Sequence, residues 1–90
     1  IIYAKLMFTL MRIVIFLNTS NLPQVTILTH LEDIRQCERK IFDAYDRYNK
    51  AGVKTIVKKD DEGNSFLELS TVEDGTISYM LCKKAIFFKK

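Results

Sequence analysis

The sequence predicts an α+β fold, a two-layer sandwich of one long helix on a mostly antiparallel four-stranded sheet, in the order β-α-β-β-β. The stretch from Thr29 to Gly52 has the period of an amphipathic helix. A continuous apolar run precedes it, and three strand-like segments separated by glycine-containing turns follow it. The 90 residues make one domain, in which residues 1–10 are an extension of the first strand or an extra edge strand.

The predicted helix begins at a capping box and ends at a glycine. Thr29 and Glu32 have the spacing at which a hydroxyl and a carboxylate each accept a backbone N–H at a helix start. Gly52 stands where the chain leaves a helix with positive φ. Glu38 lies inside the apolar arc, so we expect it to reach solvent or pair with a basic strand residue, or else to be a buried functional carboxylate. The apolar stripe comprises Leu31, Ile34, Cys37, Ile41, Ala44, Tyr45 and Tyr48, extended by Phe42.

The remaining segments read as strands and turns. Residues 11–17 are apolar throughout, which favours a central strand buried on both faces. Residues 25–28 form a short extended piece or a hydrophobic staple onto the helix. The other face of the sheet has few polar residues, so we expect the N-terminal segment or a partner to cover part of it. The predicted meander has strands at 53–59, 65–72 and 76–88, with turns at Asp60–Asn64 and Glu73–Gly75.

Composition and charge limit the classes of function. A net charge of +3 permits contact with nucleic acid or an acidic protein without requiring it. Lys5 and Arg12 interrupt the apolar N-terminal stretch, so we expect no membrane segment. Cys37 and Cys82 form no CxxC motif, and two buried free thiols in a reducing compartment are predicted in preference to a disulfide. The sequence therefore predicts a cytoplasmic protein.

The sequence contains no catalytic or cofactor motif. Its one histidine, His30, is separated from Cys37 by seven residues of predicted helix, about 10 Å, so the two cannot form a nucleophile pair directly. The acidic turn at Asp60–Glu62 does not match a calcium loop, and no phosphate-binding loop or nucleophile elbow is present. We therefore predict no enzyme activity, no cofactor and no metal.

The predicted order of elements and the basic charge resemble the small ribonuclease toxins of the RelE/ParE kind. The resemblance implies a site on the last strands, where this chain offers Tyr79, Lys83 and Lys84. Those toxins usually have two helices after the first strand and a basic or His/Tyr-bearing site, and no motif matches here. The resemblance is one of element order only. As a compact chain with few motifs, the protein is also similar to accessory or inhibitor proteins of phages, which implies a small viral regulatory protein.

Two binding hypotheses follow, ahead of a third, toxin-like enzyme. The first is a non-catalytic protein-binding or regulatory module, with a protein partner or as a homodimer, because the apolar ends exceed what a short chain buries comfortably; alternatively those ends form the core. The second is a nucleic-acid-binding module, although acidic residues offset its lysines and a solvated lysine face explains them equally. The interface candidates are Ile2, Tyr3, Leu6, Phe8, Phe87 and Phe88. The nucleic-acid candidates are Lys54, Lys58, Lys83 and Lys84 for phosphates and Tyr79 for stacking.

Overall fold

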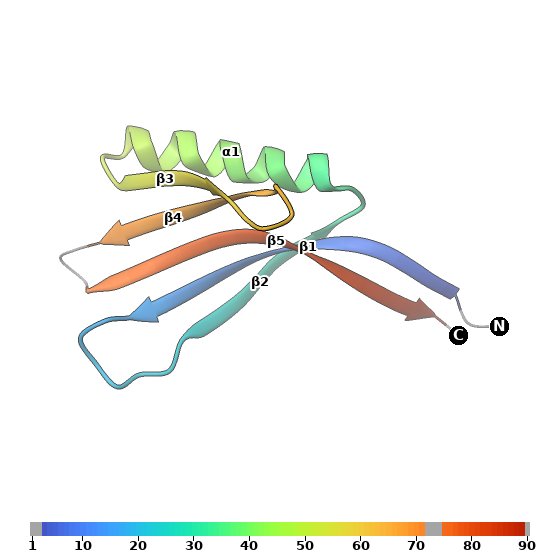
Figure 1. Cartoon of the computed structure of the whole chain (residues 1–90), viewed down its shortest axis with the longest axis horizontal. Helices are drawn as coiled ribbons and strands as arrows, with labels where there is room; N and C mark the ends of the chain where they lie inside the picture. Colours follow the sequence, from blue (N-terminus) through green and yellow to red (C-terminus); the bar gives the residue numbers. More distant parts are fainter. Residues whose placement is uncertain (1–2, 72–74, 90) are drawn as a thin grey trace.

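The computed structural model, which describes residues 3–71 and 75–89, has one helix and a five-stranded antiparallel sheet in the order β2-β1-β5-β4-β3 (Figure 1). The predicted α+β class and the meander of the last three strands are confirmed. The predicted count of four strands is wrong. The elements are β1 (Tyr3–Phe16), β2 (Gln24–Leu31), α1 (Ile34–Lys50), β3 (Lys54–Lys59), β4 (Ser65–Thr71) and β5 (Thr76–Lys89).

The additional strand is β2, which occupies the segment predicted as a short piece or a staple. Its residues pair with β1 from Gln24 to Leu31, with a bulge at Leu28, so the true order is β-β-α-β-β-β. Thr29 lies in this strand opposite Leu10 and therefore does not cap the helix as predicted. Asp33 is the N-cap instead, and its Oδ1 accepts a hydrogen bond from the Gln36 N–H at 2.8 Å. Pairing with β1 gives hydrogen-bond partners to the backbone N–H and C=O groups of this segment, which is rich in β-branched residues. The helix therefore begins after Asp33, the next residue whose side chain can cap it.

The predicted helix end is confirmed. Gly52 has a φ of 82°, and its N–H donates to the Asn49 carbonyl oxygen at 3.1 Å. The Val53 N–H donates to the Tyr48 carbonyl oxygen at 3.0 Å, which completes a Schellman motif. This motif turns the chain directly from α1 into β3.

The core lies between α1 and one face of the sheet. Cys37, Ile41 and Ala44 of the predicted stripe are fully buried, and Leu67 of β4 is fully buried against them. The extension of the stripe to Phe42 is wrong, because this side chain is 46% exposed. Phe42 follows Ile41 by about 100° of helix rotation, which carries it off the sheet-facing side.

A disulfide joins the two layers. Cys37 of α1 and Cys82 of β5 are bonded, which corrects the prediction of free thiols. Both residues were expected in the core, but the sequence does not show that their Cα atoms lie 6.2 Å apart on facing elements, a distance that a disulfide spans. The predicted cytoplasmic location rested on free thiols, so it loses that support.

Glu38 fastens the helix to the sheet by a contact that the sequence did not indicate. Its Oε2 accepts a hydrogen bond from the Ser65 N–H at 3.0 Å, at the first residue of β4. The carboxylate therefore binds a backbone group rather than a basic side chain, and its partial burial is accounted for by the packing of α1 on β4.

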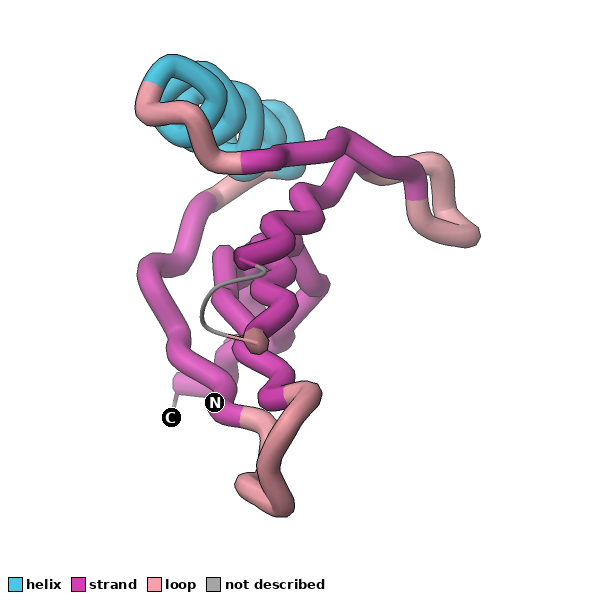
Figure 2. Tube along the Cα trace, turned by 90° about the vertical axis from the view of Figure 1, so that its left-hand side faces the viewer, coloured by secondary structure: helices cyan, strands magenta, loops and turns pink. Residues whose placement is uncertain are grey.

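The N-terminal segment lies in the plane of the sheet. β1 pairs with β5 from Tyr3 opposite Lys89 to Phe16 opposite Thr76, so the segment extends the first strand and does not cover the other face as we expected. In Figure 2 the helix lies at the top, at the edge of the sheet formed by β3, and the other strands continue below it. Within the described residues, no helix is long and apolar enough to cross a membrane.

The turn before β5 is described only at its last residue. Glu73 and Asp74 of the predicted Glu73–Gly75 turn lie outside the described residues. Gly75 has the positive φ that the prediction required, 63°, and its carbonyl oxygen accepts a hydrogen bond from the Leu17 N–H at 2.8 Å. This contact joins the end of β1 to the start of β5.

Candidate binding surfaces

The first candidate surface is a two-stranded arm, formed by residues 3–7 of β1 and 85–89 of β5, which pair from Tyr3 opposite Lys89 to Met7 opposite Ala85. β2 reaches β1 only as far as Phe8, and β4 reaches β5 only as far as Met80. The arm therefore extends beyond the neighbouring strands and the helix, at the end of the molecule where both ends of the chain lie (Figure 1).

The arm exposes large apolar side chains on both faces. Its two faces are assigned by the strand register, because paired residues point to the same side. Leu6, Ile86 and Phe88 share the side of Cys82, whereas Tyr3 and Phe87 point to the other side. The exposed fractions are 64% for Tyr3, 51% for Leu6, 59% for Ile86, 37% for Phe87 and 68% for Phe88.

The interface candidates predicted from the sequence are thus partly gathered in one place. Tyr3, Leu6, Phe87 and Phe88 all lie on the arm, while Phe8 packs against the buried core at its base. Ile2 lies outside the described residues. Ile86 was not among the predicted candidates, although it belongs to the same apolar run. The two-residue period of a strand places Ile86 on the same face as Phe88, and this signal could have identified it.

The second candidate surface is the sheet face opposite α1, called here the open face. Cys82 points toward the helix, because it is bonded to Cys37 of α1. The odd-numbered residues of β5 and their strand partners therefore point away from the helix. Over β2, β1 and β5 this face is largely apolar, with Tyr79 and Lys83 as the polar residues of β5 on it, and no described element covers it. The apolar side chains on this part are Val25, Ile27, Met11, Ile13, Ile15, Ile77 and Leu81.

Over β4 and β3 the open face carries a polar group centred on Glu68. Its Oε2 lies 2.9 Å from the Lys58 Nζ, and its Oε1 accepts a hydrogen bond from the Tyr79 hydroxyl at 3.2 Å. The hydrogen bond from Lys58 lowers the pKa of Glu68, and the same contact raises the pKa of Lys58. Burial, followed by the Glu68 contact, raises the pKa of Tyr79. The three groups hold one another in their ordinary charge states at neutral pH.

The structure divides the predicted nucleic-acid candidates between two faces. Lys54, Lys58, Tyr79 and Lys83 lie on the open face by register. Lys84 points to the helix side, where its Nζ lies 3.9 Å from a carboxylate oxygen of Glu62. The element order on which the toxin resemblance rested is also absent, because two strands precede the helix.

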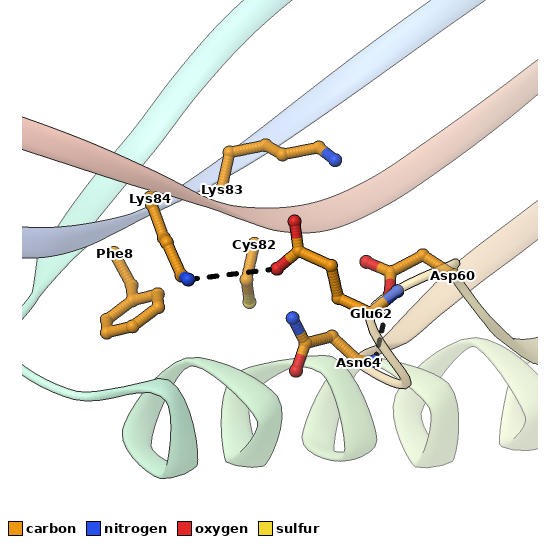
Figure 3. Close-up of a pocket in the computed structure, with 7 residues that line it drawn as sticks. All are labelled: Phe8, Asp60, Glu62, Asn64, Cys82, Lys83 and Lys84. Atoms are coloured by element: carbon orange, nitrogen blue, oxygen red, sulfur yellow. Dashed lines mark hydrogen bonds and ion pairs between the residues drawn. The ribbon is translucent and has the colours of Figure 1, made fainter.

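A pocket of about 220 Å³ lies between the β3–β4 turn and β5, beside the disulfide (Figure 3). The ion pair between Lys84 and Glu62 spans it. The Asp60 Oδ1 accepts hydrogen bonds from the backbone N–H groups of Glu62 and Asn64, both at 2.9 Å, and so shapes the turn. The Lys83 side chain points away from Glu62 and Lys84 (Figure 3), so the charged groups in the pocket are the paired Glu62 and Lys84 and the Asp60 carboxylate, which is engaged in the turn. Its lining residues are Phe8, Asp60, Glu62, Asn64, Cys82, Lys83 and Lys84.

His30 has a structural contact on each side. Its Nδ1 and the Thr9 Oγ1 share a hydrogen bond of 2.9 Å, and its ring meets that of Phe87 edge-on with centroids 4.8 Å apart. These contacts fasten the end of β2 to the base of the arm. Because Cys37 and Cys82 are bonded to each other, neither is a free thiol that His30 could activate.

The molecule has more surface than a compact chain of its size. Its accessible area is 6643 Å², whereas a folded monomer of 10.5 kDa exposes about 5,400 Å². Its radius of gyration is 14.8 Å, against about 12 Å for a compact domain of this length. The surplus area of about 1,200 Å² exceeds the roughly 800 Å² that each partner contributes to a standard interface.

The chain matches no family model, no curated protein and no solved structure, so these surfaces are interpreted from its own residues.

Proposed function

We propose that this protein is a small non-catalytic, protein-binding module that contacts its partner through the arm. The observation that carries the proposal is the exposure of large apolar side chains on both faces of a two-stranded ribbon. Such a ribbon is marginally stable alone in water, and a partner that covers it stabilises it. A regulatory or inhibitory role requires no more than this contact.

The charges near the arm favour a protein partner over nucleic acid. On the arm, the Lys5 Nζ lies 3.1 Å from a carboxylate oxygen of Glu32. At its base, Lys84 is paired with Glu62. These lysines are matched by acids of the same chain, so the outstanding feature of the arm is its apolar area, which suits the centre of a protein interface.

The second candidate function is nucleic-acid binding on the open face. Lys54, Lys58 and Lys83 lie there, with Tyr79 beside Phe66 at a centroid distance of 6.3 Å. Glu68 lies among them, and a phosphate that approached Lys58 would meet its carboxylate. Titration with random-sequence duplex and single-stranded nucleic acid across a salt series tests this alternative. Micromolar binding that weakens steeply with salt would favour it over the arm.

The disulfide bears on where the protein folds. A disulfide buried between helix and sheet persists in an oxidising compartment and is uncommon in reducing ones. We therefore propose an oxidising compartment in place of the predicted cytoplasm. Trapping thiols with an alkylating reagent in the producing cells, followed by mass measurement, tests this. Unlabelled Cys37 and Cys82 are expected, and labelling of both in the folded protein would contradict the proposal.

A photo-crosslinking residue placed in the arm tests the main proposal. We would replace Phe88 with a benzophenone-bearing phenylalanine analogue and compare it with the same replacement at Phe42 of α1. Both are exposed aromatic residues, at 68% and 46%, so Phe42 is a matched control. Irradiation in the producing cells should give a discrete protein adduct from position 88 and none from position 42.

Two outcomes would contradict this use of the arm. One is the absence of any adduct from position 88, and the other is the same set of adducts from both positions. A Leu6→Ser variant with the analogue at position 88 provides a further check. It should retain the fold, because Leu6 is 51% exposed, yet give a weaker adduct.

A further inference from the structure

The two edges of the sheet differ sharply in charge. β3, at one edge, is KTIVKK and presents Lys54, Lys58 and Lys59. β2, at the other edge, is QVTILTHL and contains no lysine, arginine, aspartate or glutamate. Lysines on an edge strand prevent association with another strand, because pairing would bury their charge. β3 has this protection, whereas β2 has no charged residue and is interrupted only by a bulge at Leu28, beyond the stretch from Gln24 to Ile27 that pairs regularly with β1.

β2 presents both backbone groups and apolar side chains at its edge. Its inner side pairs with β1, and no described strand pairs with its outer side. Val25 is 61% exposed, Ile27 is 59% exposed and Leu28 is 45% exposed. Val25 and Ile27 continue the apolar part of the open face to the very edge of the sheet. An uncharged apolar edge of this kind is a template for a further strand.

The strand that fits this edge is β2 of a second copy. When β2 is paired antiparallel with itself about a two-fold axis at Thr26, Val25 stands opposite Ile27 of the partner subunit. Both of these residues belong to the open face, so the apolar side chains meet on one side and the threonines meet on the other. Cross-strand pairs of β-branched residues stabilise a sheet. A two-fold contact of this kind also closes on itself, without leading to filaments.

The charge and area of the chain agree with a second copy. Pairing through β2 places the lysine-bearing β3 edges of the two copies at opposite ends of the joined sheet. At that separation the electrostatic repulsion between two copies, each with a net charge of +3, is weakest. At the β2 edge, Val25 and Ile27 are 61% and 59% exposed, so a second copy would bury apolar side-chain area there while the arm stays accessible.

We propose that the protein is a homodimer in which the β2 strands of two copies pair antiparallel, forming one continuous sheet. The interface goes beyond the proposed function, because it uses a surface separate from the arm. Failure of either proposal leaves the other standing.

The solution mass of two matched variants tests the interface. Ile27→Lys puts a charge into the proposed contact, and Ile56→Lys puts the same charge on an exposed isoleucine of the already basic β3. In sedimentation equilibrium, the wild type and Ile56→Lys should have the mass of two chains. Ile27→Lys should raise the dimer dissociation constant by about 100-fold or more. A monomeric wild type, or equal effects of the two variants, would overturn the proposal.

A covalent test fixes the register and remains informative if a lysine variant folds poorly. Thr26→Cys places two thiols opposite each other across the two-fold axis, at a spacing that a disulfide can bridge. Mild oxidation should convert this variant to a covalent dimer, while Lys54→Cys on β3 should remain a single chain. If instead Thr26→Cys fails to link and Ile13→Lys dissociates the dimer, the copies pack through their open faces, and pairing through the β2 edge is refuted.

Discussion

Loss of the Cys37–Cys82 disulfide should destabilise the fold more than any other single change that the structure suggests. The bond closes a loop with a sequence separation of 45 residues. The loss of chain entropy in the unfolded state for a loop of this length corresponds to about 4 kcal/mol. A 90-residue domain has a total stability of roughly 5–13 kcal/mol, so reduction removes a large part of it. The expected fall in Tm is about 15–30 °C.

Thermal and urea unfolding, followed by far-ultraviolet circular dichroism, would measure this effect on the oxidised and the reduced protein. A Cys37→Ala/Cys82→Ala double variant is the control. It should unfold near the reduced wild type, with a further loss from the buried sulfur atoms, and should not respond to reductant. If reduction changes the free energy of unfolding by less than about 1 kcal/mol, the disulfide does not stabilise the layers as we argue.

Three further changes test local features. Gly75→Ala should cost about 1–3 kcal/mol, and more than Gly63→Ala, because both glycines have positive φ but only at Gly75 would a Cβ collide with the Asn18 side chain; equal losses in urea unfolding would contradict the collision. Ser65→Ala should leave stability unchanged or raise it by about 1 kcal/mol, since the buried Ser65 hydroxyl has no partner among the described residues, and a clear loss would show an overlooked contact. Because the folded pKa of Glu68 is lowered, its contribution is present above its ordinary value of 4.5 and is lost as pH falls through the folded pKa. Glu68→Gln should therefore flatten the acid side of the stability–pH curve, and an unchanged curve would count against the Lys58–Glu68 contact.

The parts of the fold that the sequence predicted well are those with a local signal. The buried stripe at Cys37, Ile41 and Ala44 follows from helical periodicity, and the helix end follows from Gly52. The meander follows from turn residues between strand-like runs. Each of these signals lies within a few neighbouring residues, which is why reasoning on periodicity and turns recovers them.

The parts that the sequence did not predict depend on contacts between distant residues. β2 was missed because Thr29, together with Glu32 just after the strand, matches a capping box, and only pairing with β1 shows that the threonine lies in a strand. The disulfide depends on a distance between two layers that no spacing in the chain reveals. The Glu38–Ser65 hydrogen bond is likewise set by the packing of α1 on β4.

The candidate surfaces were predicted in composition but not in arrangement. The surplus of apolar residues at both ends was visible in the sequence, and it pointed to Leu6 and Phe88. Their union in one arm follows from the pairing of β1 with β5 along their whole length. The division of the lysines between two faces is also a consequence of register, since Lys83 and Lys84 are neighbours in sequence and point to opposite sides.

The central claim is that the exposed apolar surface of this chain is covered by protein. The most direct test is the native mass of the protein, isolated gently from the cells that produce it and measured by non-denaturing mass spectrometry. We predict assemblies that contain two copies of the 10.5 kDa chain together with a bound protein, and no substantial population of the bare single chain. A single chain of 10.5 kDa with nothing bound, at the concentration found in those cells, would contradict the account.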